Sequence, residues 1–195
     1  MASASEEIHD VIIIGAGWSG LLSCKYAKEE NLSVRVLEQR EDLGGVWKYS
    51  EEINVTTAMK KSCTSSSSTL TEISDFPMPE EIGEFPVHWD IYKYLNSYAE
   101  KFNLRRYIRF NTSVARMNKL GDVWNILTKD NVEYYSRNII ICTGVHQKPN
   151  RSFQDTCLKG FTGEVCHSGS LKEFDERHRG KGFIHTSNFR SALLS

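Results

Sequence analysis

Six residues near the start of the chain have the types and spacing of a phosphate-binding turn. The run Gly15-Ala16-Gly17-Trp18-Ser19-Gly20 follows the apolar stretch Val11 to Ile14 and precedes residues with helical periodicity. In such a GxGxxG turn the first glycine permits a tight bend, the second lets the backbone approach a diphosphate, and the third lets helix and strand pack closely. The diphosphate then lies at the positive end of the helix, where backbone N–H groups donate to it. The run therefore predicts a dinucleotide site.

An acidic residue, Glu38, ends the next apolar stretch of the chain. A carboxylate at this point accepts hydrogen bonds from a free ribose hydroxyl and repels a 2′-phosphate. Glu38 is therefore predicted to bind the ribose, and it favours FAD or NAD over NADP at this site.

The elements that position these residues follow from hydrophobic periodicity. A strand, a helix and a second strand around the glycine run form a βαβ unit, and an apolar stripe predicts a later amphipathic helix. Alternating residues further on predict an antiparallel insertion, followed by a buried strand that ends at Thr143-Gly144. In chain order we expect a strand at 10–14, a helix at 18–30, a strand at 33–38, loop at 50–87, a helix at 89–103, and strands at 106–117, 123–128, 132–135 and 138–142.

Composition excludes several other classes of protein. The 195 residues carry 24 basic and 25 acidic side chains, a formal net charge of -1, with 39% hydrophobic residues. Such a balance is that of a globular domain and argues against nucleic acid as a partner, which requires clustered Lys and Arg. No apolar run approaches the roughly 18 to 20 residues that cross a bilayer, and the start lacks the features of a secretory signal. We therefore expect a cytoplasmic protein without a transmembrane segment.

Cysteine and histidine give no catalytic or metal site. The five cysteines lack CxxC spacing, and His167 beside Cys166 cannot by itself supply the four ligands of a zinc site. His146 and His167 are each read as satisfied hydrogen-bonding residues rather than as general bases. No catalytic side chain and no metal ligand is predicted.

The residues after Glu38 carry a more specific signal. The pattern Glu38-x5-Gly44-Gly45-x-Trp47 resembles the FAD-binding half of the flavin-containing monooxygenases and the related Baeyer–Villiger monooxygenases. The likeness continues through further blocks of that family, of which the FxGxxxH signature is the most specific. These blocks are Ser74-Asp75-Phe76-Pro77-Met78-Pro79, Tyr94-Leu95-x2-Tyr98-Ala99, Ile141-Cys142-Thr143-Gly144 and Phe161-Thr162-Gly163-Glu164-Val165-Cys166-His167.

This resemblance implies an α/β fold, a three-layer Rossmann-like FAD-binding domain with an antiparallel β insertion, and an enzyme whose reactive group is the flavin. In the family NADPH reduces FAD, and the reduced flavin uses O2 to oxygenate a nucleophilic nitrogen or sulfur of a small molecule, as in N,N-dimethylaniline monooxygenase. It assigns Gly45, Val46, Trp47, Thr143 and Gly144 to FAD, and places Thr64 and Ser65 near the nicotinamide. Some relatives are anchored to the endoplasmic reticulum membrane by their C-terminus.

The chain departs from the family pattern at three places. Leu171 stands where the FxGxxxH signature ends in an aromatic residue, and Ser65 stands where many animal members have an asparagine near the flavin. A hydroxyl cannot present both the donor and the acceptor of an amide. The third departure follows Lys181, where a second glycine motif for NADPH is expected and does not occur.

The resemblance therefore predicts an incomplete domain. Residues 1–160 form the FAD-binding domain, 161–181 a linker toward an NADPH domain that the chain lacks, and 182–195 a divergent tail. Two alternatives to a monooxygenase stay open. One is a catalytically silent fragment that binds FAD or nothing, and the other is a flavin reductase or oxidase that does not oxygenate a substrate. The sequence leaves the substrate and the oligomeric state open.

Overall fold

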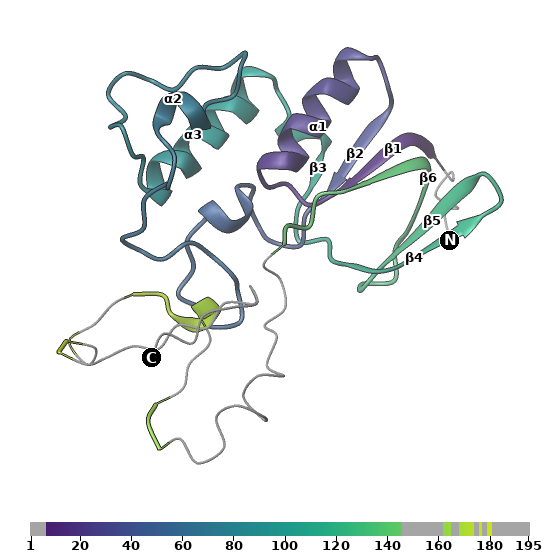
Figure 1. Cartoon of the computed structure of the whole chain (residues 1–195). Coiled ribbons are helices and arrows are strands. Elements are labelled where there is room, and N and C mark those ends of the chain that lie inside the picture. Colours follow the sequence, from purple (N-terminus) through teal and green to yellow (C-terminus); the bar gives the residue numbers. More distant parts are fainter. Residues whose placement is uncertain (1–6, 146–161, 165–167, 174–175, 177–178, 181–195) are drawn as a thin grey trace, which may run out of the picture.

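A six-stranded mixed sheet with helices on one face forms the centre of the computed structural model (Figure 1). The structure describes residues 7–145, 162–164, 168–173, 176 and 179–180. The strand order is β3-β2-β1-β6-β5-β4. The strands are β1 (Ile8–Ile14), β2 (Val34–Leu37), β3 (Ile108–Arg109), β4 (Val114–Leu120), β5 (Val123–Thr128) and β6 (Glu133–Ile141). This is the α/β, Rossmann-like class that the sequence predicts.

The predicted βαβ unit is present at the N-terminus. Strands β1 and β2 are parallel, with Ile13 opposite Val36, and α1 (Trp18–Glu29) connects them. The amphipathic helix is α3 (His88–Lys101), which lies on the same face of the sheet as α1 (Figure 1). One core joins these elements, because Val11 and Ile13 of β1 pack in the same cluster as residues of both helices.

A second, smaller core fills the opposite face of the sheet. Ile12 and Ile14 point away from the helices, because successive residues of a strand face opposite sides. They pack with Leu37 of β2 and with Ile126 of β5, which is fully buried. The antiparallel strands continue the same six-stranded sheet, and through Ile126 they contribute to the core on the face that the helices leave open.

The structure corrects the predicted strands of the second half. The stretch 106–117 is not one strand, because the turn η2 (Arg105–Tyr107) leads into β3, which pairs in parallel with β2 at the far edge from β4. The predicted strands 132–135 and 138–142 are one strand, β6, which is antiparallel to β5 near its start and parallel to β1 along its length. Its end is also less buried than expected, since Ile140 is 37% and Ile141 is 61% exposed.

The stretch 50–87 is largely irregular, as predicted, but it contains the short helix α2 (Ser68–Thr71). The Ser67 hydroxyl accepts a hydrogen bond from Leu70 N, which caps this helix. Further along, the turn η3 (Ser168–Ser170) precedes residues that contact this irregular stretch, with Lys60 N donating to Lys172 O at 3.0 Å. His146, His167, Phe161 and the tail 182–195 lie outside the described residues.

Among the residues that the structure describes, no helix has the length and apolar character needed to span a bilayer.

Candidate functional site

The predicted glycine run forms a tight turn at the carboxyl end of β1. Gly15 has φ +102°, and a Cβ added to it would stand 2.5 Å from Cys142 O at the end of β6. A Cβ on Gly20 would stand 1.9 Å from Gly15 O, far inside van der Waals contact. Both positions therefore require glycine, and the turn brings α1 directly onto the ends of two parallel strands.

The first turn of α1 keeps its backbone donors available. Gly17 is the N-cap residue and supplies no side-chain cap, and the first turn contains no acidic residue. Leu21 N is the first helix donor with a backbone partner, Gly17 O at 3.0 Å. The N–H groups of residues 18–20 have no acceptor in the part of the chain that the structure describes. Such a helix end attracts an anion, and a phosphate group suits it.

A second pair of glycines, Gly44 and Gly45, lies close to Gly17 at the start of α1. Gly44 and Gly45 have φ +109° and +55°, and they open the 3-10 turn η1 (Gly45–Trp47). A Cβ on Gly45 would stand 3.0 Å from Gly17 Cα, and a Cβ on Gly17 would stand 3.6 Å from Gly45 Cα. The two bare backbones therefore approach closely, and no side chain of either glycine shields the backbone from a bound diphosphate.

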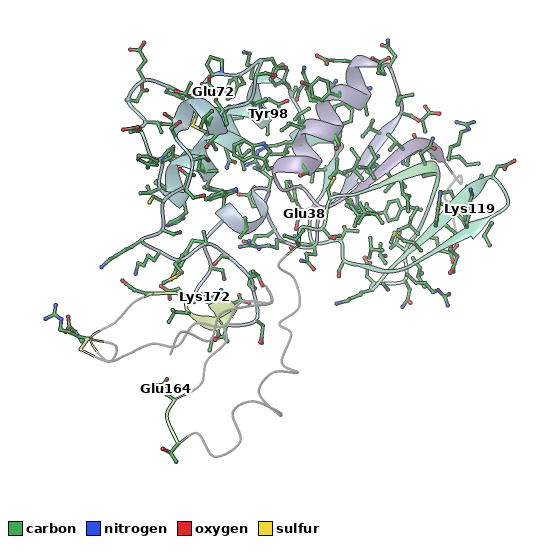
Figure 2. The ribbon with its side chains drawn as sticks, in the orientation of Figure 1. Glu38, Glu72, Tyr98, Lys119, Glu164 and Lys172 are labelled. Carbon is green, nitrogen blue, oxygen red and sulfur yellow. The ribbon has the colours of Figure 1, made fainter. Side chains whose placement is uncertain are left out.

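Glu38 lies between these two glycine segments and is 5% exposed. Its Oε2 accepts a hydrogen bond from Ala16 N at 2.7 Å, and its Oε1 accepts one from Arg40 N at 2.9 Å. Each carboxylate oxygen retains a second lone pair, so the group can still accept from a ribose hydroxyl. Figure 2 shows Glu38 just below the N-terminal end of α1. We refer to residues 15–20, 38 and 44–47 together as the glycine cradle.

A polar cluster supports the cradle from α3. Tyr92 packs against Gly44, where an added Cβ would meet the tyrosine ring at 2.8 Å, and its hydroxyl donates to Asp42 Oδ2. Asp42 also accepts from Leu43 N at 2.9 Å and pairs with Arg105 at 3.1 Å. Burial alone would raise the pKa of Asp42, but these donors and the charges of Arg105 and Lys48 outweigh burial and lower it. Asp42 is therefore a carboxylate at neutral pH.

The other predicted site residues differ in how close they lie to the cradle and in how exposed they are. Thr143 and Gly144 follow β6 beside Gly15, whose added Cβ would lie 3.6 Å from Thr143 Cα, so they border the cradle. Trp18 and Trp47 are half-buried against the main core, whereas Val46 is 39% exposed. Ser19, also part of the predicted run, is exposed at the start of α1.

Thr64 has local hydrogen-bond partners, and Ser65 is exposed. The Thr64 hydroxyl donates to Ser66 O at 2.7 Å, and its backbone N donates to Pro86 O at 2.9 Å. The Ser65 side chain is exposed. Their assignment to the nicotinamide region stays a prediction.

One further feature of the surface was not predicted. A pocket of about 430 Å³ opens beside Tyr92 and does not include the glycines of the cradle. Its lining residues are Lys48, Tyr49, Lys60, His88, Trp89 and Tyr92. Among the described residues no group of three or more acidic, histidine or cysteine side chains could hold a metal ion.

Sequence comparison connects this architecture to known proteins. A model of a family described as flavin-binding monooxygenase-like matches residues 8–185. The chain is 34% identical over 178 residues to dimethylaniline monooxygenase (N-oxide-forming) 2 of Macaca mulatta, an alignment that covers 85% of this chain and 33% of that protein. It is 33% identical to flavin-containing monooxygenase 2 of Homo sapiens, with the same coverage. The chain thus spans about a third of the length of the curated relatives it matches.

Structural comparison gives matches of the same kind. A flavin-containing monooxygenase from Stenotrophomonas maltophilia superposes with a TM-score of 0.61 at 27% identity, over 71% of this chain and 39% of that one. A steroid monooxygenase bound to NADP superposes with a TM-score of 0.62 at 25% identity, over 71% of this chain and 26% of that one.

Proposed function

Because the chain belongs to the flavin-binding monooxygenase-like family, we propose that its glycine cradle binds FAD and that the chain supplies the FAD-binding part of an NADPH-dependent monooxygenase. Residues 1–160 would form this part, and 161–181 would be a linker toward an NADPH-binding region. The family assignment agrees with the resemblance seen in the sequence.

One observation carries the proposal, the close approach of Gly17 and Gly45 at the open start of α1. The N–H groups of residues 18–20 would donate to the diphosphate of FAD, and the two glycines would let it lie against bare backbone. Glu38 would accept from the ribose of the adenosine. Thr143 and Gly144 would border the same ligand from the end of β6.

Bound FAD would supply the redox chemistry, since a flavin takes a hydride from NADPH and passes oxygen from O2 to a substrate. The residues of the cradle would bind and orient it. The dimethylaniline and flavin-containing monooxygenases among the relatives support a nucleophilic nitrogen or sulfur of a small molecule as the oxygenated atom.

The test of FAD binding is the visible absorption spectrum of the purified chain after incubation with FAD and gel filtration. We expect the chain to retain flavin and the Gly17→Val variant to lose it, because the added side chain would fill the gap to Gly45. Gly83→Val is the matched control, since nothing lies within 4 Å of a Cβ at that position. A colourless wild-type chain, or equal flavin content in Gly17→Val, would contradict the proposal.

The activity is tested separately, with NADPH and N,N-dimethylaniline added to the FAD-loaded chain. Oxygen uptake with formation of the N-oxide would support a monooxygenase. NADPH oxidation without oxygenated product would instead favour a flavin oxidase or reductase. Absence of NADPH oxidation would restrict the function of this chain to binding FAD.

A further inference from the structure

The side chain of Arg40 crosses the η1 turn of the cradle, although nothing in the sequence pattern singles it out. Its Nη1 donates to Gly45 O and to Lys48 O, both at 3.0 Å. These carbonyls belong to the first residue of η1 and to the residue that ends it. One guanidinium nitrogen therefore bridges the turn from end to end.

Arg40 also closes a ring of hydrogen bonds through all three segments of the cradle. Its backbone N donates to Glu38 Oε1 at 2.9 Å, and the other oxygen of Glu38 accepts from Ala16 N at 2.7 Å. Ala16 O in turn accepts from Gly44 N at 2.9 Å. The bond from Arg40 to Gly45 O completes the circuit. Within this ring, Arg40 connects Glu38, the carboxylate proposed to bind the ribose, to the Gly44–Gly45 turn. Its backbone bonds to Glu38 and its side chain bonds to the turn.

The turn that Arg40 bridges needs such support. Gly44 and Gly45 are both in the left-handed region, and glycine loses more backbone freedom on ordering than any other residue. The planar guanidinium is always charged and offers several donors in a fixed fork, so its bonds to carbonyls are charge-assisted. Asn111 N donates to Arg40 O at 3.0 Å, which anchors the arginine backbone to the loop after β3.

We propose that Arg40 is a positioning residue for FAD, which holds the Gly44–Gly45 turn at the distance from α1 and Glu38 that the cofactor requires. The inference rests on the proposed function, since it concerns the same site. Arg40 acts on the cofactor through the turn, and its loss weakens FAD binding more than the accompanying loss of stability explains.

The experiment measures the dissociation constant for FAD by flavin fluorescence in the wild-type chain, Arg40→Gln and Arg40→Lys. Arg40→Gln is expected to bind FAD about tenfold or more weakly, because two charge-assisted hydrogen bonds are lost. Arg40→Lys keeps the positive charge but not the several donors of the guanidinium. Its dissociation constant should lie between those of the wild type and Arg40→Gln. Arg116→Gln changes an exposed arginine of β4 outside the cradle and is expected to bind as the wild type does.

Two further measurements separate positioning from general stability. Ile126→Val loosens the second core and lowers the melting temperature, but it should leave the FAD dissociation constant unchanged. Without FAD, the Gly44 and Lys48 amides should exchange hydrogen faster in Arg40→Gln than in Arg116→Gln.

The outcomes distinguish this inference from the proposed function. FAD binding by Arg40→Gln within twofold of the wild type, or unchanged exchange of those amides, would overturn the role of Arg40 alone. A wild-type chain that binds no FAD would overturn the proposed function and the role of Arg40 with it. Weaker binding by Ile126→Val to the same extent as Arg40→Gln would show that stability, rather than positioning, sets the affinity.

Discussion

Residues in and beside the cradle matter in two ways: the glycines by having no side chain, and the charged residues by the hydrogen bonds that they make. Gly15 and Gly20 are glycines because neighbouring backbone occupies the place of a side chain. Glu38 and Arg40 contribute a carboxylate and a guanidinium, and each bonds to backbone in another segment. The surface that we propose to face the phosphates is thus mainly backbone, while charged side chains hold that backbone in place.

The packing at Gly20 leads to a first prediction. Gly20→Ala is expected to lower the free energy of unfolding by about 3 kcal/mol, because its methyl group would overlap Gly15 O and push α1 away from β1. Urea unfolding measures this change. Gly83→Ala, which meets open space, should stay within about 0.5 kcal/mol of the wild type. Equal unfolding midpoints for the two variants would contradict this reading of the turn.

At the scale of elements, two tyrosines of α3, Tyr94 and Tyr98, differ in the hydrogen bonds that their hydroxyls make. Tyr94 accepts a hydrogen bond from Ile73 N at 2.7 Å and donates to Phe76 O, so it ties the irregular stretch to the helix. One turn later, the buried hydroxyl of Tyr98 has no hydrogen-bond partner within the described ranges. Burial raises the pKa of both phenols. The two side chains share one aromatic cluster with Phe76.

This difference gives a second prediction. Tyr94→Phe should lower the free energy of unfolding by about 1 to 2 kcal/mol, since it leaves Ile73 N and Phe76 O without their partner. Tyr98→Phe should leave stability unchanged or raise it by up to about 1 kcal/mol, because it removes a buried group that makes no bond. Urea unfolding of both variants tests this. Equal destabilisation by the two changes would show that Tyr98 has a partner.

Strand β1 supplies a third prediction, which concerns pH. Burial lowers the pKa of His9 below its ordinary value of 6.5, as does the charge of Arg35, whereas Glu7 and Asp10 act in the opposite direction. The unfolded chain therefore takes up a proton near pH 6.5 while the folded chain resists it, so stability falls as pH drops below that value.

We expect this loss to reach at most about 1.4 kcal/mol by pH 5.5, one unit below the ordinary pKa. Unfolding free energies at pH 7.5 and 5.5 should differ less in His9→Gln than in the wild type. The same pH dependence in both would show that His9 is not responsible.

At the scale of the whole molecule, contacts distant in sequence connect the loop after the cradle to Lys172. Val46 O of η1 accepts from Ala58 N at 2.8 Å, and the neighbouring Thr57 hydroxyl lies 3.4 Å from Lys172 Nζ. Lys172 Nζ also donates to Val55 O, and burial lowers its pKa. Figure 2 shows Lys172 below Glu38, on the side of the irregular stretch. Lys172 is therefore attached to the loop that leads away from the glycine pair.

A fourth prediction tests this attachment. In Lys172→Met the Lys60 amide, which donates to Lys172 O, should exchange hydrogen about fivefold faster, the equivalent of one hydrogen bond of about 1 kcal/mol. Lys129→Met, at the exposed turn between β5 and β6, is the control. Glu173 also pairs with the Lys60 ammonium, at 3.2 Å. Unchanged protection of the Lys60 amide in Lys172→Met would mean that this ion pair and the backbone bond hold the segment without the Lys172 ammonium.

The local features of this protein were determined by the sequence itself. The βαβ unit, α3, the GxGxxG turn and the acid at Glu38 were all predictable, because each depends on periodicity or spacing within about 30 residues. The family was predictable for a similar reason, since its motifs are short and follow one another in order.

Only the tertiary structure decided what depends on pairing between separate segments of the chain. The stretches 132–135 and 138–142 form one strand because β1 pairs with residues 135–141 across the gap between them, and the two-residue β3 exists only because β2 lies beside it. The bonds from Arg40 to Gly45 O and Lys48 O, five and eight residues along the chain, could not be predicted either, because they depend on the conformation of η1 and not on a periodic pattern. Pairing between separate segments produces no periodic pattern in the sequence. Such contacts are therefore identified only from the folded structure.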